Sequence, residues 1–182
     1  MIAPLAERVP PKKYGGTERL IYSLTEELVR RGHDVTLFAT GDSITSAKLN
    51  AVLPKSAREL KIKPLYDVNA PTLQVLGRAY AQMDGQFDVI HDHTGYASLP
   101  FAQMTKTPVV ITMHSPIPPD KLPLYREFRK ANLVSISKEI GRDFTELNHL
   151  GTVYNGLNLS YYPFSAEHDG YLLYVGRICH DK

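Results

Sequence analysis

The sequence lacks the features that would place it in several broad classes of protein. A single cysteine among 182 residues excludes an intrachain disulfide framework and suits a reducing compartment. No stretch approaches the roughly 18 apolar residues of a membrane-spanning helix, and the opening residues, MIAPLAE, have too short an apolar run for a signal peptide. We therefore expect a cytoplasmic protein, and contact with a membrane surface stays open.

Charge of one sign is also scarce. The formal net charge is only +2, and no block of five or more like charges occurs, which argues against a nucleic-acid partner. Several catalytic signatures are missing as well: there is no GxSxG elbow, no GxxxxGK[ST] loop and no complete GxGxxG fingerprint. Cys179 has no evident catalytic partner. What remains is an ordinary globular composition, 43% hydrophobic and 22% charged, which is large enough for a real core.

Short apolar runs alternate with amphipathic ones along the chain. The clearest helix has Leu20, Leu24 and Leu28 four residues apart and ends before Gly32. Strands alternating with helices imply parallel pairing through right-handed crossovers. The pattern therefore predicts a doubly wound, mostly parallel, Rossmann-like α/β sheet flanked by helices. Helices are predicted at 17–31, 72–83 and 138–148, and strands at 2–3, 35–39, 87–91, 108–113, 133–136 and 152–154.

The composition changes after residue 154. Residues 155–170 are rich in Asn, Tyr, Ser and Gly and resemble a linker, and a new strand is predicted from Tyr171 to Arg177. A strand with no following helix leads us to expect a truncated protein of two domains. Residues 1–164 would form the first domain and its linker, and residues 165–182 the first strand of the second domain.

Three polar segments follow predicted strands, where doubly wound sheets bind their ligands. The first contains Gly15 and Gly16, whose bare amides at a helix start could receive a phosphate; a flexible turn is the alternative. The second is His91-Asp92-His93, in which alternation places both histidines on one face, for a ligand, a metal or a structural hydrogen bond. No third metal ligand is identifiable by spacing, so no metal is expected.

The third segment contains His114, which could donate to phosphate or a sugar hydroxyl, transfer a proton, or simply be packed. Near the end of the sequence, Arg177 and Lys182 together could neutralise a diphosphate leaving group. No cofactor is predicted.

Taken in order, these segments resemble the retaining glycosyltransferases of family 4. The resemblance covers nearly the whole chain, and only the ordered set of motifs is specific. It rests on VPPKKYGGTE at 9–18, VIHDH at 89–93, MH at 113–114, SIS at 135–137, VYNGLN at 153–158 and VGRICHDK at 175–182.

The resemblance implies the first half of a two-domain GT-B fold that moves a hexosyl group from a nucleotide-diphosphate sugar to an acceptor, with retention. It places Gly15, Gly16, Arg177 and Lys182 at the donor phosphates and His114 near the donor sugar and reaction centre. The donor would be a UDP-, GDP- or ADP-sugar. The acceptor would be a sugar, a lipid or a small molecule.

Acceptor contacts are predicted for the N-terminal domain, including Tyr14, with His93 as a sugar contact. Lys12, Lys13 and the region 40–63 are further candidates for acceptor contacts, and the chain alone is expected to be inactive. Two alternatives stay open: a noncatalytic sugar-binding module, and a nucleotide-sugar epimerase or glucan phosphorylase of related architecture.

Overall fold

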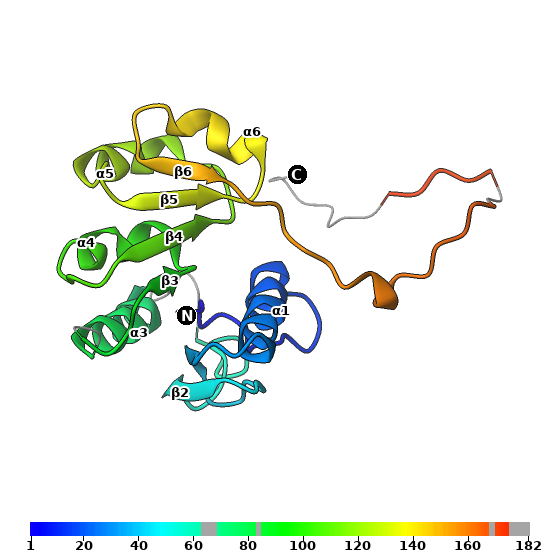
Figure 1. Ribbon diagram of the computed structural model, residues 1–182, viewed down its shortest axis with the longest axis horizontal. Coiled ribbons are helices and arrows are strands. Elements are labelled where there is room, and N and C mark those ends of the chain that lie inside the picture. The colour runs from blue at the N-terminus through cyan, green and yellow to red at the C-terminus, as the bar shows by residue number, and fades with distance from the viewer. Residues whose placement is uncertain (63–68, 83–84, 168–169, 175–182) are drawn as a thin grey trace.

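The computed structural model describes residues 1–62, 69–82, 85–167 and 170–174, and over these residues the chain is a mixed α/β domain (Figure 1). Every strand pairing within the described residues is parallel. Parallel strands cannot be joined by a tight hairpin, so helices and long loops connect them. The predicted fold class, a mostly parallel Rossmann-like sheet flanked by helices, is confirmed.

The chain enters the sheet in its middle. Ile2 forms parallel bridges to Phe38 on one side and to Asp92 on the other. After Ile2, the chain first adds strands on the Phe38 side of the sheet and later adds strands on the Asp92 side. The strand order therefore reverses between Ile2 and Asp92, and sheets of this kind bind ligands at such a point. The order is β2 (Lys48–Leu53), β1 (Thr36–Thr40), Ile2, β3 (Ile90–Asp92), β4 (Val109–Met113), β5 (Asn132–Ser135) and β6 (His149–Thr152).

Helices cover both faces of this sheet. Neighbouring strand residues point to opposite faces, and they fall into two separate apolar clusters. Ala3 and Leu37 pack with Ile21 of α1 (Gly16–Arg30), whereas Ile2 and Phe38 pack with α3 (Asn69–Ala81). The helices α1 and α3 therefore lie on opposite sides (Figure 1). The larger cluster also receives side chains from α4 (Leu99–Ala102), α5 (Leu122–Glu127) and α6 (Lys138–Gly141).

Most predicted elements are present within three residues of their expected bounds, but the helix predicted over 138–148 is wrong in length. It ends at Gly141 and continues as a single 3-10 turn, Arg142–Phe144. The chain must then reach β5, because His149 already pairs with Leu133, so β6 starts three residues earlier than predicted. Among the described residues, one strand and two α-helices were not predicted. The edge strand β2 lacks clean alternation, and α4 and α5 are short and contain prolines.

Residues 153–167 and 170–174 extend away from the sheet with one 3-10 turn, Leu159–Tyr161, and no strand (Figure 1). The strand predicted from Tyr171 is absent over Tyr171–Tyr174, whose side chains are 65 to 102% exposed. A strand requires a neighbouring strand, and none of the strand pairings within the described residues includes this segment. The assignment of residues 165–182 to a second domain stays a prediction. Within the described residues, no helix has the length and apolar character needed to cross a membrane.

Candidate functional site

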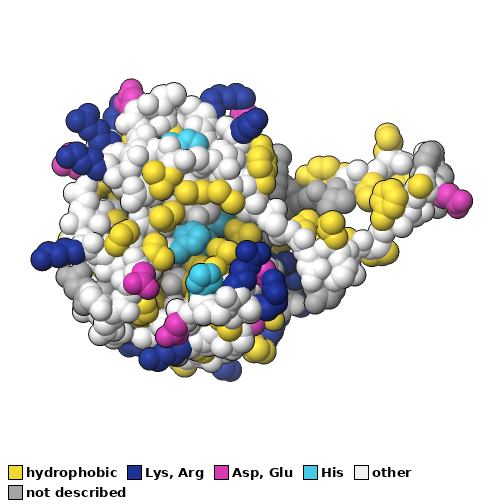
Figure 2. Space-filling view, in the orientation of Figure 1, with side chains coloured by type: hydrophobic (Ala, Val, Ile, Leu, Met, Phe, Trp, Pro, Cys, Tyr) yellow, Lys and Arg dark blue, Asp and Glu magenta, His cyan; other side chains and the backbone are white. Residues whose placement is uncertain are grey.

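Polar residues gather at the carboxyl ends of the central strands. His93 follows β3 and His114 follows β4, which pairs with β3 in parallel. The long loop that begins after Ala3 leads to the glycine turn at the start of α1. Figure 2 shows histidine side chains in a hollow of the molecular surface, bordered by hydrophobic side chains and by a group of lysines and arginines.

Strand β3 carries polar side chains on both of its faces. The rings of His91 and His93 stack with centroids 4.2 Å apart. Asp92 points the other way, where its carboxylate accepts hydrogen bonds from the backbone N–H and the hydroxyl of Thr94, both at 2.7 Å, and from Tyr80 of α3 at 3.3 Å. The predicted alternation of His91, Asp92 and His93 between the two faces of the strand is therefore confirmed. Asp92 has a structural role on the face opposite the two histidines.

His93 and His114 are joined directly. Nδ1 of His93 lies 2.9 Å from Nε2 of His114, and Nε2 of His93 lies 3.0 Å from Sδ of Met1. His93 is only 4% exposed, whereas His114 is partly exposed. A direct contact between His93 and a sugar, as the sequence predicts, would require one of these two hydrogen bonds to break.

Burial keeps these histidines neutral. Loss of hydration lowers the pKa of His91 and of His114 to about 4, and lowers the pKa of His93 well below its ordinary value. His91 is also hydrogen-bonded, with its Nε2 2.7 Å from the hydroxyl of Thr112 on β4. A neutral imidazole has one donor and one acceptor nitrogen, so the site offers directed hydrogen bonds rather than positive charge.

A metal is not held by this cluster in its present geometry. Among the described residues, no three side chains of His, Cys, Asp or Glu are arranged to bind a metal ion. The facing nitrogens of His93 and His114 point at one another, so they are not free to share an ion.

The glycine turn has a backbone conformation that few other residues adopt. Gly15 has φ of +154°, and a Cβ atom added there would lie 2.8 Å from Cβ of Pro11. Gly16 begins α1, and a Cβ atom at this position would meet nothing within 4 Å. The first N–H groups of a helix have no partner within the helix. Those of Gly16 and Thr17 make no hydrogen bond to any described residue.

The loop before this turn is anchored on segments that follow β1 and β2. Val9 forms two hydrogen bonds to adjacent residues after β1. Its N–H donates to the Ser43 hydroxyl at 2.9 Å, and its carbonyl accepts from the N–H of Ile44 at 2.7 Å. After β2, the N–H of Ala57 donates to the carbonyl of Leu5 at 2.9 Å. The region 40–63, a predicted acceptor region, thus supports the glycine turn. These anchors also place the turn at the carboxyl edge of the sheet.

One residue of this turn was missed by the sequence analysis. Glu18 is 6% exposed, and a carboxylate oxygen lies 2.9 Å from where a Cβ atom of Gly15 would be. Burial raises its pKa, while a hydrogen bond from its own backbone N–H opposes the rise. The available signal was its spacing: a glutamate at the third helical position commonly folds back over the helix start.

The remaining predicted residues are placed as follows. Tyr14 is 56% exposed beside the glycine turn. Arg177 and Lys182 lie outside the described residues, so their position relative to the turn stays a prediction. Glu26 of α1 is bonded to the Thr45 hydroxyl at 2.7 Å and to Ser46, and therefore ties α1 to the loop before β2.

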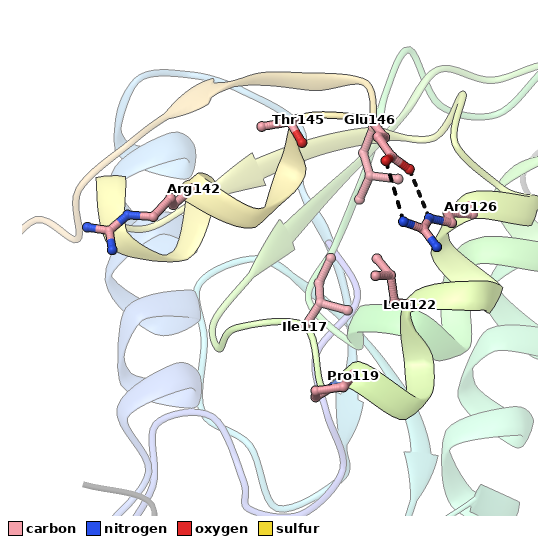
Figure 3. Close-up of a pocket in the computed structure, with 8 residues that line it drawn as sticks. Ile117, Pro119, Leu122, Arg126, Arg142, Thr145 and Glu146 are labelled. Carbon is pink, nitrogen blue, oxygen red and sulfur yellow. Dashed lines mark hydrogen bonds and ion pairs between the residues drawn. The ribbon is translucent and has the colours of Figure 1, made fainter.

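A separate cavity of about 460 Å³ lies between α5 and the turn Arg142–Phe144 (Figure 3). Its charged side chains are already neutralised: Arg126 pairs with Glu146 at 2.8 Å, while Arg142 points away from it and pairs with Glu139 at 2.6 Å. It contains none of the predicted site residues, and we do not assign the function to it.

The fold and this polar edge define a class: a Rossmann-like domain with polar side chains gathered where the strand order reverses. Residues 14–161, well over half of the chain, match the model of Glycosyltransferase Family 4. The chain therefore belongs to glycosyltransferase family 4 and has a glycosyltransferase-type function. No curated protein matches the sequence. The resemblance noted from the motifs is thus confirmed at the level of the family.

Proposed function

We propose that this domain takes part in transferring a hexosyl group from a nucleotide-diphosphate sugar to a hydroxyl acceptor, with retention of configuration. The bond between the anomeric carbon and the diphosphate oxygen breaks, and its electron pair leaves with the diphosphate. A bond forms between that carbon and the acceptor oxygen, whose proton passes to the leaving diphosphate. The donor would be a UDP-, GDP- or ADP-sugar, and the acceptor a sugar, a lipid or a small molecule.

The observation that carries the proposal is the glycine turn. The N–H groups of Gly16 and Thr17 are unpaired among the described residues at the positive end of a 15-residue helix. Fixed donors of this kind stabilise the negative charge that grows on a departing diphosphate, and they do so without a metal. His114, neutral and partly exposed just after β4, is suited to a sugar hydroxyl rather than to the phosphates.

Glu18 limits how a diphosphate can approach. Its buried carboxyl lies against Gly15, and a carboxylate repels phosphate. Because burial raises its pKa, a bound anion would stabilise the protonated carboxyl further. Donor binding at this turn should therefore raise the pKa of Glu18 further.

The residues proposed for the opposite side of the donor site lie outside the described residues. Arg177 and Lys182 would hold the donor phosphates from a second domain that begins near residue 165, and Tyr14 would contact the acceptor. The chain of 182 residues alone is then expected to be inactive. A cytoplasmic location is also proposed, supported by the single cysteine.

The test compares two substitutions at one position in a protein that includes the proposed second domain. Gly16→Pro and Gly16→Ala both add a Cβ atom, but only proline removes the N–H, and the first helical position tolerates proline. With a panel of nucleotide sugars, we expect acceptor-dependent release of nucleotide. We expect kcat/KM for Gly16→Pro to lie about a hundredfold below that of Gly16→Ala, the usual cost of losing one such donor.

Equal activities of the two folded variants would contradict the role of this amide. Nucleotide release without any need for an acceptor would overturn the transferase proposal in favour of the related enzymes. Sugar binding without turnover would favour the noncatalytic module.

A further inference from the structure

The histidine pair raises a question that its distances answer: which nitrogen of His114 carries the proton? His93 has a partner at each ring nitrogen, His114 at Nδ1 and Met1 at Nε2. At 4% exposure it has almost no access to water, so these two partners account for its hydrogen bonds. The protonation of the pair therefore has to be consistent with what each partner can give or take.

The sulfur of Met1 determines which ring nitrogen of His93 carries the proton. A thioether sulfur accepts hydrogen bonds and has no hydrogen to donate. Nε2 of His93, 3.0 Å from this sulfur, must therefore carry the proton, because two lone pairs would otherwise face each other in a buried place. A neutral imidazole has only one such proton, so Nδ1 of His93 is the acceptor.

The position of the proton on His93 in turn determines its position on His114. Nδ1 of His93 accepts from Nε2 of His114 across 2.9 Å, so the proton of His114 is on Nε2. Nδ1 of His114 is then left with a lone pair, and no described residue donates to it. His91, whose ring stacks on that of His93, is hydrogen-bonded to Thr112 and makes no hydrogen bond to His93.

We propose that Met1 and His93 are positioning residues that hold His114 as its Nε2–H tautomer, with Nδ1 presented as a hydrogen-bond acceptor. A lone pair at this place selects a group that donates, such as a sugar hydroxyl, and disfavours an ionised phosphate oxygen, which can only accept. The consequence for the substrate rests on the proposed function, whereas the tautomer is a property of the free protein. The two sides of the site then have opposite polarity: amide donors at the glycine turn and an acceptor at His114.

Nuclear magnetic resonance of the 182-residue chain, with ¹⁵N in the histidine rings, tests the tautomer directly near neutral pH. We expect Nε2 of both His93 and His114 to give the shift of a protonated nitrogen and Nδ1 of both to give that of a bare nitrogen. A protonated Nδ1 on His114 would overturn the proposal, whatever the enzyme transfers.

Two substitutions extend the test to activity in the protein that includes the proposed second domain. His93→Asn keeps a carbonyl oxygen that can accept from His114, and His93→Leu removes every acceptor. We expect Leu to return His114 to a mixture of tautomers and to lower kcat/KM about tenfold or more, and Asn to restore both the tautomer and most of the rate.

If both folded variants kept a single Nε2–H tautomer, His93 would not be the positioning residue. If the tautomer changed in the leucine variant and the rate did not, the role of the tautomer in catalysis would be wrong. If the protein showed no transfer activity at all, the proposed function would fail, while the ring spectra would still decide the tautomer.

Discussion

The glycine turn and the histidine pair lie at the same edge of the sheet but are held there by opposite means. The turn is fixed by backbone geometry and by anchors from its loop to the segments after β1 and β2. The histidines are fixed by side-chain hydrogen bonds between neutral groups in a desolvated place. We call the glycine turn with the loop before it, residues 4–16, the glycine wall, and His91, His93 and His114 the histidine wall. Steric fit should control the stability of the glycine wall, and protonation should control that of the histidine wall. Four experiments distinguish steric control of the glycine wall from control of the histidine wall by protonation.

Acidification should have the largest effect, and it acts on the histidine wall. The pKa of His91 and of His114 is lowered to about 4 in the folded protein, so the unfolded chain binds more protons between pH 4 and about 6.5. Stability is therefore lost as the pH falls through this window, by about 3 kcal/mol for each histidine. Asp92, whose pKa burial raises to about 6, opposes the loss, because its folded form binds the extra proton.

Urea unfolding at pH 7 and pH 4.5 measures the net change, which we expect to be a loss of a few kcal/mol. His114→Gln should remove a large part of it, while the exposed His33→Gln serves as the matched control and should remove none. Identical pH profiles for the two variants would show that His114 is not the desolvated group.

Substitution of Gly15 should have the next largest effect, on the other wall. Gly15→Ala forces a Cβ atom against Pro11 and requires a positive φ, at a cost of about 1 to 3 kcal/mol. Gly16→Ala, one residue further on, meets no atom and should change the free energy of unfolding by less than about 0.5 kcal/mol. Equal losses for the two variants would contradict the geometry of the turn.

Removing one hydroxyl from the histidine wall should have a moderate effect. Thr112→Val removes a buried hydroxyl, leaves the partly buried His91 without its partner and should cost about 1 kcal/mol in urea unfolding. The same substitution at Thr25 is the control, because this hydroxyl is buried in α1 with no hydrogen-bond partner among the described residues. We expect Thr25→Val to leave stability unchanged or to increase it; a larger loss there than at Thr112 would contradict the assignment.

The smallest effect should come from a surface charge on the glycine wall. Lys12 forms an ion pair with Glu59, and the two side chains are 59% and 32% exposed. Solvent screens such pairs, so Lys12→Ala should change the free energy of unfolding by less than about 0.5 kcal/mol. A loss above 1 kcal/mol would mean that charge, and not backbone geometry, holds the loop.

The sequence predicted the sheet because its buried strands are short apolar runs with a helix or a loop between them. It also placed His91 and His93 on one face, since alternation is a local property of a strand. The contact between His93 and His114 could not be read in this way, because it depends on the register between β3 and β4, which are separated by 16 residues along the chain. The anchoring of the loop by residues 43–57 was hidden for the same reason. The edge strand β2, with mixed exposure, gave no clear pattern.

The order of residues in β3 has a consequence for how this site can change. His91-Asp92-His93 reads the same in both directions, and a slip of one position would exchange its two faces. A carboxylate would then stand where the imidazoles now do, and the ligand would meet a negative charge instead of a neutral ring. An insertion or deletion of a single residue just before Ile90 would thus replace a neutral hydrogen-bonding surface with a carboxylate, which favours cationic ligands.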